Sequence, residues 1–417
     1  MAVRKRDARR GHSRRRCTAG AVLAALLLAP GCSAPGNTET GITAQEVGAA
    51  LDRRAAALMA HDTGAYLAEL DPRATSFRAA QRTELHNLAD VPLESWAYQV
   101  KDVTDEGADR ATAEVELRYR IKGYDKAPMS SSRTVELVRR GEGRPWYIAA
   151  DRAADGSPGQ LWQQGDVEVV RGTHSLVLGV GRPTAELRGI AATADRAVPA
   201  VTGSWPEPWA ERVVVLVPES VEDMAGLLDS PVSSYRGIAA VTTGEVGGSG
   251  RAPADRVIVN PQAYGLLGDF GQRVVLTHET THVATRAHTS AATPVWLSEG
   301  FADRVAYRQE SRTAAEVAPE LAEAVRRGEL PAHLPTDEDF GFGEDAGRLS
   351  RAYEGGWLAC ELIARDWGDE ELIAFYRAVG SRSERDGAVE QAMHTVLGTT
   401  PQDFTARWRE YLRDRLG

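Results

Sequence analysis

Apolar and polar residues alternate along the chain with two different periods. Over residues 44–70 the apolar positions recur at helical spacing, so Val47, Leu51 and Leu58 fall on one face. Thr43 followed by Glu46 matches a capping box, and we predict that one or two helices fill this segment. Two-residue alternation follows, which predicts β-strands. The predicted strands are WAYQVKDV, ATAEVELRYRI, SRTVELVRR and PWYIAADR.

Helices followed by an antiparallel sheet predict an α+β domain over residues 44–155. This order of elements resembles the cone-shaped nuclear transport factor 2-like fold. The turn formers of ADGSPGQ, residues 154–160, predict the domain boundary. We interpret His61 and His86 in this domain as surface or cap residues.

The second predicted domain covers residues 165–417 and is also α+β, with a small sheet followed by helices. Its strands are predicted at HSLVLGV, VVVLVP, GIAAVTTG and DRVIVNP, and its first helices at TAELRGIAATADRAVPAV and SVEDMAGLL. From Asp269 onward the pattern is almost entirely helical. Asp269, with Gln272 three residues later, predicts the cap of a helix over 270–287. Another helix is predicted to begin near Ser298, after the break at Pro294.

The N-terminus has the three parts of an export signal. Eight basic residues precede the short apolar run AGAVLAALLLAP, which ends at small residues, so we predict a signal peptide over 1–31. LLLAPGC resembles a bacterial lipobox and predicts lipidation of Cys32, followed by a flexible tether over 32–43. We therefore expect a lipoprotein on the extracytoplasmic face of the cell membrane, or a secreted protein if Cys32 is not lipidated.

Composition narrows the range of partners and chemistry. The chain has 417 residues and a net charge of −10, and removal of residues 1–31 would shift this charge to −17. An acidic surface argues against nucleic acid as a partner. Cys360 would be the one thiol left beside Cys32, so no intrachain disulfide framework is expected. Because it lies in the apolar helical pattern WLACELIA, Cys360 is interpreted as a core residue.

The segment HETTH, residues 278–282, is the main candidate for chemistry. On a helix, His278 and His282 lie one turn apart on the same face, so both imidazoles can reach one metal ion. Glu279 lies about 100° further round the helix, where a base for an activated water is needed. The alternative is a pair of polar residues on a solvated helix face.

The segment WLSEGFAD favours the metal site. Glu299 follows His282 by 17 positions, which allows a second helix to cross the first and supply a third ligand. Two histidines and one glutamate are a common ligand set for catalytic zinc. Asp303, one turn beyond Glu299, could accept the other ring N–H of a ligand histidine.

HETTH followed by WLSEGFAD resembles the gluzincin metallopeptidases. The resemblance in architecture covers roughly residues 170–417, and this region is similar to the small peptidase MA-like domains of bacterial exported proteins. The resemblance implies a Zn²⁺ site of His278, His282 and Glu299, with Glu279 as base. AYEGGWLACEL is similar to the segment in which a tyrosine steadies the oxyanion, which implies this role for Tyr353; packing on a helix is the alternative. No segment resembles the one that binds a free N-terminus in the aminopeptidases of this group.

We therefore expect a zinc metallopeptidase, acting as an endopeptidase on peptides or proteins at the cell surface. Two alternatives stay open: an aminopeptidase, and a lipid-anchored binding or scaffold protein with a catalytically silent zinc fold.

Overall fold

The computed structural model describes residues 42–417, with the exception of 108, 142, 244–254, 309 and 342–345. The predicted signal peptide, Cys32 and most of the predicted tether lie outside the described residues. Among the described helices, none combines the length and apolarity needed to cross a membrane.

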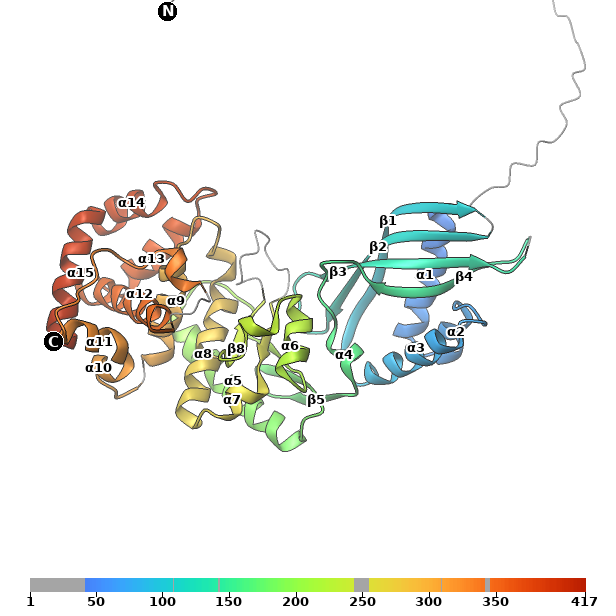
Figure 1. The fold of residues 1–417 in the computed structure, drawn as a ribbon, viewed down its shortest axis with the longest axis horizontal. Helices are drawn as coiled ribbons and strands as arrows, with labels where there is room; N and C mark the ends of the chain where they lie inside the picture. Colours follow the sequence, from blue (N-terminus) through green and yellow to red (C-terminus); the bar gives the residue numbers. More distant parts are fainter. Residues whose placement is uncertain (1–41, 108, 142, 244–254, 309, 342–345) are drawn as a thin grey trace, which may run out of the picture. The chain divides into compact units, whose positions relative to one another are not determined.

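Three helices precede the first sheet (Figure 1). They are α1 (Ala44–Met59), α2 (Thr63–Ala68) and α3 (Thr75–Asn87). The predicted capping box is confirmed, because the Glu46 N–H donates to Thr43 while the Glu46 carboxylate accepts from the Thr43 backbone. Helix α3 is an element that the hydrophobic pattern did not reveal, since its sequence is mostly polar.

The four predicted strands form one antiparallel sheet in the order β1-β2-β3-β4. Its strands are β1 (Leu93–Gly107), β2 (Arg110–Ile121), β3 (Met129–Arg139) and β4 (Trp146–Ala153). In β2 every second side chain is buried, from Ala111 to Ile121, as the alternation predicts. The buried face packs with α1 and α2 into an apolar core that also includes Trp162, from the short helix α4 (Leu161–Gln164).

The second sheet is mixed, in the order β5-β6-β7-β9-β8. Its strands are β5 (Val167–Arg171), β6 (Ser175–Val180), β7 (Val213–Val217), β8 (Ala240–Thr242) and β9 (Val257–Val259). Strands β6, β7 and β9 run parallel, whereas β5 and β8 are antiparallel edge strands. All six residues of β6 are buried, which explains its continuous apolar sequence. Strand β5 was not predicted.

Helices cover and follow this sheet. Between its strands lie α5 (Thr184–Ser204), α6 (Val221–Leu228) and the 3₁₀ turn η1 (Val232–Ser234). The following elements are α7 (Pro261–Gly265), α8 (Asp269–Thr285), η2 (Arg286–His288), α9 (Val295–Tyr307), α10 (Ala314–Val317), α11 (Pro319–Arg326), η3 (Asp337–Phe340), α12 (Ala346–Asp366), α13 (Asp369–Gly380), α14 (Ala388–Ala392), the π-helical turn η4 (Met393–Leu397) and α15 (Pro401–Leu416).

Two predicted helix starts are wrong by a few residues. Gly268 occupies the cap position of α8, and Asp269 is already the first helical residue. Gln272 does not return a capping bond but donates to the carbonyls of Tyr264 and Leu267. Helix α9 begins at Val295, directly after Pro294, where the missing proline N–H costs no helical hydrogen bond.

The apolar core is continuous across the predicted domain boundary. One cluster of buried side chains runs from Val47 in α1 to Leu178 and Ile258 in the second sheet. A second cluster unites α9 and α11–α15, and it contains the fully buried Cys360. The interpretation of Cys360 as a core residue is confirmed. The division at 154–160 stays a prediction.

Candidate metal centre

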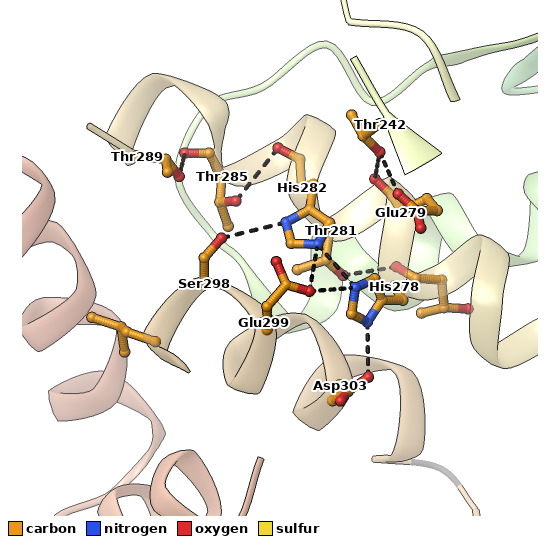
Figure 2. Close-up of polar contacts among 12 residues, drawn as sticks. Thr242, His278, Glu279, Thr281, His282, Thr285, Thr289, Ser298, Glu299 and Asp303 are labelled. Carbon is orange, nitrogen blue, oxygen red and sulfur yellow. Dashed lines mark hydrogen bonds and ion pairs between the residues drawn. The ribbon is translucent and has the colours of Figure 1, made fainter. Parts of the chain in front are cut away.

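Helix α8 carries both histidines of HETTH on one face. Figure 2 shows the two rings side by side, with His278 Nε2 2.9 Å from His282 Nε2. The helix contains several β-branched residues, which have weak helix propensity. Tertiary packing compensates for this weak propensity, because the side chains of Thr280, Thr281 and Thr285 are buried against the rest of the protein.

Helix α9 crosses α8 and brings Glu299 to the same point. Glu299 Oε2 lies 3.2 Å from His278 Nε2 and 3.7 Å from His282 Nε2. The three groups are the one set of ligand-type side chains within the described residues that converges closely enough for a metal ion. Donors bound at about 2.0–2.1 Å to a tetrahedral zinc lie about 3.3 Å apart. Separations of 2.9, 3.2 and 3.7 Å therefore fit such an ion.

Asp303 supports His278 from behind. Its Oδ1 lies 2.8 Å from His278 Nδ1, as Figure 2 shows. A ring N–H at Nδ1 that donates to this carboxylate leaves Nε2 with its lone pair toward Glu299 and His282. Ser298 Oγ lies near the corresponding nitrogen of His282, at the longer distance of 3.5 Å.

The electrostatics of the site favour a cation at its centre. Burial by itself would lower the pKa of His278, but the adjacent Asp303 and Glu299 hold it well above its usual value. Burial by itself would raise the pKa of Glu299, but His282 and His278 bring it below its usual value. Two carboxylates thus surround two imidazoles in a site with little solvent.

Glu279 lies beside the ligand cluster and is held by the second sheet. Figure 2 shows its carboxylate turned toward Thr242, on the edge strand β8. Thr242 Oγ1 lies 2.7 Å from Glu279 Oε2 and 3.1 Å from the Glu279 carbonyl oxygen. Thr242 was not identified from the sequence, since a buried threonine in a short apolar strand has no distinguishing local pattern.

Two glycines set the distance between α9 and α12. A Cβ atom on Gly300 would lie 2.2 Å from the backbone oxygen of Gly356. A Cβ atom on Gly356 would in turn lie 2.7 Å from the Trp296 carbonyl oxygen. The crossing therefore requires glycine at both positions, and it fixes the backbone next to Glu299.

Tyr353 lies on α12, the helix that carries this crossing. Its half-buried ring packs edge-to-face against Phe340, with ring centroids 5.1 Å apart. This contact accounts for a packing role, and the role in oxyanion binding stays a prediction.

A further polar network lies at the end of α8. Arg286 Nε is 3.1 Å from both oxygens of Asp255, and its Nη2 donates to the Thr243 carbonyl. Arg256, which follows Asp255 in the chain, forms a buried bidentate ion pair with Asp125, in the connection between β2 and β3 of the first sheet. The first sheet is thus joined to the segment that flanks the candidate metal site.

Comparison with known proteins does not assign the chain to a family. No family model and no curated protein matches the sequence. A solved structure of yeast LTA4 hydrolase is similar with a TM-score of 0.37 and 11% identity; the match covers 78% of this chain and 60% of that enzyme. A SEC-C motif-containing protein from Rhodopseudomonas palustris is similar with a TM-score of 0.18 and 21% identity, over 24% of this chain and 72% of that one. These TM-scores are too low for either similarity to support a function, so any functional assignment depends on the geometry of the candidate metal site.

Proposed function

We propose that the protein is a zinc-dependent hydrolase that cleaves peptide bonds. The observation that carries the proposal is the convergence of His278, His282 and Glu299 with separations that suit a tetrahedral ion, at the helix that also carries Glu279. Three protein ligands are the number that a catalytic zinc site uses, because the fourth position is kept for water or substrate.

A bound zinc ion would act as a Lewis acid that lowers the pKa of water and polarises a carbonyl group. Glu279 would accept the proton of the attacking water and pass it to the leaving amine. The Thr242 hydroxyl fixes the orientation of the Glu279 carboxylate. Asp303 fixes the ring of His278. Tyr353 is proposed to stabilise negative charge on the carbonyl oxygen.

Strand β8 is the proposed place for the substrate backbone. It is an edge strand, so one side of it has no partner strand within the described sheet, and Thr242 joins it directly to Glu279. An extended peptide could therefore add to this edge with its scissile bond near the base. The N–H of Thr243 bonds to the Arg256 carbonyl of the neighbouring chain segment, so in the alternating antiparallel ladder the N–H of Ala240 faces the open edge. Substitution of proline for Ala240 should therefore abolish cleavage, whereas an unchanged rate would exclude this binding mode.

Two variants of the full chain test the hydrolase proposal. Glu279→Gln should retain zinc and lose turnover of a peptide library, because the amide cannot accept the proton. His278→Ala should lose zinc, measured by atomic absorption on the purified protein. Wild-type turnover by Glu279→Gln would refute the proposed base. Bound zinc without cleavage of any library peptide would instead favour the silent scaffold, and activity restricted to peptides with a free N-terminus would favour an aminopeptidase.

We also propose that the protein is exported and anchored through a lipid on Cys32, on the strength of the signal-like N-terminus. Radiolabelled palmitate should enter the wild-type chain and not Cys32→Ser. Release of the wild-type protein into the medium without label would support secretion.

A further inference from the structure

A buried charge cluster lies between α1 and the first sheet, apart from the candidate metal site. Arg54 of α1 and Arg133 of β3 both pair with Asp151 of β4. Arg54 Nη1 donates to Asp151 Oδ2 at 2.7 Å, and Arg133 Nε donates to Oδ1. All three side chains are less than 5% exposed. Burial by itself would raise the pKa of Asp151, but the two arginines hold it below its usual value, so two guanidinium groups face one ionised carboxylate.

The cluster has more hydrogen-bond donors than acceptors. Arg54 Nε, Arg133 Nη1 and Trp162 Nε1 are buried, and none has a hydrogen-bond partner among the described residues. All three groups are obligate donors. Buried polar groups are nearly always paired in folded proteins, so three such donors in one place offer a site for a hydrogen-bond acceptor.

These three residues line one enclosed cavity of about 10 Å³. This volume holds about one atom of the size of a water oxygen. Glu84 also lines the cavity; its carboxylate accepts from Gln81, and burial raises its pKa. Because Gln81 engages the Glu84 carboxylate, the unpaired N–H groups of the two arginines remain, and charged donors of this kind bind anionic acceptors most strongly.

A cavity of about 620 Å³ adjoins the small one. Leu58, Leu85 and Leu88 line both cavities, so these three side chains form part of the wall that the cavities share. The volume is in the range of binding sites for small organic molecules. Other apolar residues that line the larger cavity include Met59 and Val91.

The lining of the larger cavity carries no negative charge. Its polar residues include His61, Arg82 and His86, and no Asp or Glu is among the described residues that line it. Both histidines are exposed, which confirms their interpretation as surface residues, and both also line this cavity. A molecule in this space would have apolar surroundings, with the cation Arg82 in the lining and Arg54 and Arg133 in the adjoining small cavity.

We propose that this pair of cavities binds a medium-chain or long-chain carboxylate. The acyl chain occupies the larger cavity, and one carboxylate oxygen passes the three leucines to accept hydrogen bonds from Arg133, Arg54 and Trp162. The small cavity admits a single oxygen atom, which favours a carboxylate over a phosphate head group with three terminal oxygens. The site is independent of the candidate metal centre.

Isothermal titration of the full chain with decanoate tests this proposal. We expect saturable binding with one site per chain, and binding of decanol at least tenfold weaker because it lacks the anionic head. Ala89→Trp, at an exposed position that lines the larger cavity, should abolish binding by filling the space. The same titration with His278→Ala should be unchanged, which separates this site from the metal site.

Two arginine variants then locate the carboxylate. Arg133→Gln should weaken decanoate binding at least tenfold, whereas Arg82→Gln, at the exposed side of the larger cavity, should change it less than threefold. If Arg133→Gln does not fold, the comparison of decanoate with decanol and the Arg82→Gln variant still decide the matter. Lack of saturable binding, equal binding of decanol, preference for decyl phosphate, or loss of binding in Arg82→Gln would each overturn the proposal.

Discussion

Removal of one charge from the Asp125–Arg256 pair should destabilise the protein strongly. Two hydrogen bonds of 2.7 Å join the carboxylate to the guanidinium, and the side chains are only 1% and 4% exposed. Burial by itself would lower the pKa of Arg256, but Asp125 raises it, so the arginine stays charged. Asp125→Asn therefore leaves a buried cation without the carboxylate that is hydrogen-bonded to it.

The expected loss in the free energy of unfolding is about 3 kcal/mol, at the low end of the range of 3–5 kcal/mol for one partner of a buried ion pair. The low end applies because Arg256 Nη1 also contacts the Asp255 carbonyl, and because asparagine can still accept the Ile121 N–H that Asp125 Oδ2 accepts. The double variant Asp125→Asn/Arg256→Met should recover at least about 2 kcal/mol relative to the sum of the single variants.

Chemical unfolding followed by circular dichroism measures these changes. The matched control is Glu136→Gln, which breaks an ion pair with Arg152 whose side chains are 46% and 58% exposed. This control should lose less than about 1 kcal/mol, because exposed ion pairs are solvated and screened. Equal losses in Asp125→Asn and Glu136→Gln, or additive effects of the two changes in the buried pair, would refute the reasoning.

Three further predictions concern the metal-bearing half of the chain. Gly300→Ala should lower both stability and zinc affinity, since its Cβ would lie 2.2 Å from a backbone oxygen of α12. The control is Gly189→Ala, whose Cβ meets no atom within 4 Å and which should be neutral or stabilising by up to about 1 kcal/mol. Glu354 accepts backbone N–H groups of α11, and burial raises its pKa to about 7. Because the folded state therefore holds this proton more tightly than the unfolded state, protonation of Glu354 stabilises the fold. This contribution to the free energy of unfolding is complete below pH 4.5 and is lost as the pH rises to about 7. Relative to Glu354→Gln, the wild type should lose about 2 kcal/mol in unfolding free energy across this interval, and a pH-independent difference would contradict the assignment. Thr242→Val should lower peptide turnover about tenfold or more at unchanged zinc content, because it removes the hydrogen bond to Glu279; an unchanged rate would show that the bond does not orient the base.

Local sequence was sufficient for features that depend on one element. The alternation in β2 predicted which side chains are buried, because successive residues of a strand point to opposite faces. The four-residue spacing of His278 and His282 placed both rings together, because it is close to one helical turn. Helix α3, by contrast, has few apolar residues, so its sequence did not carry the helical pattern.

Tertiary structure alone decided how these elements meet. The sequence placed Glu299 on a second helix, but its approach to His278 depends on the crossing of α8 and α9. Thr242 reaches Glu279 across 37 positions, and Arg256 reaches Asp125 across 131, distances over which local patterns hold no information. Such contacts follow from the packing of separate elements, since the free energy that selects them comes from burying whole surfaces and not from any single segment of the chain.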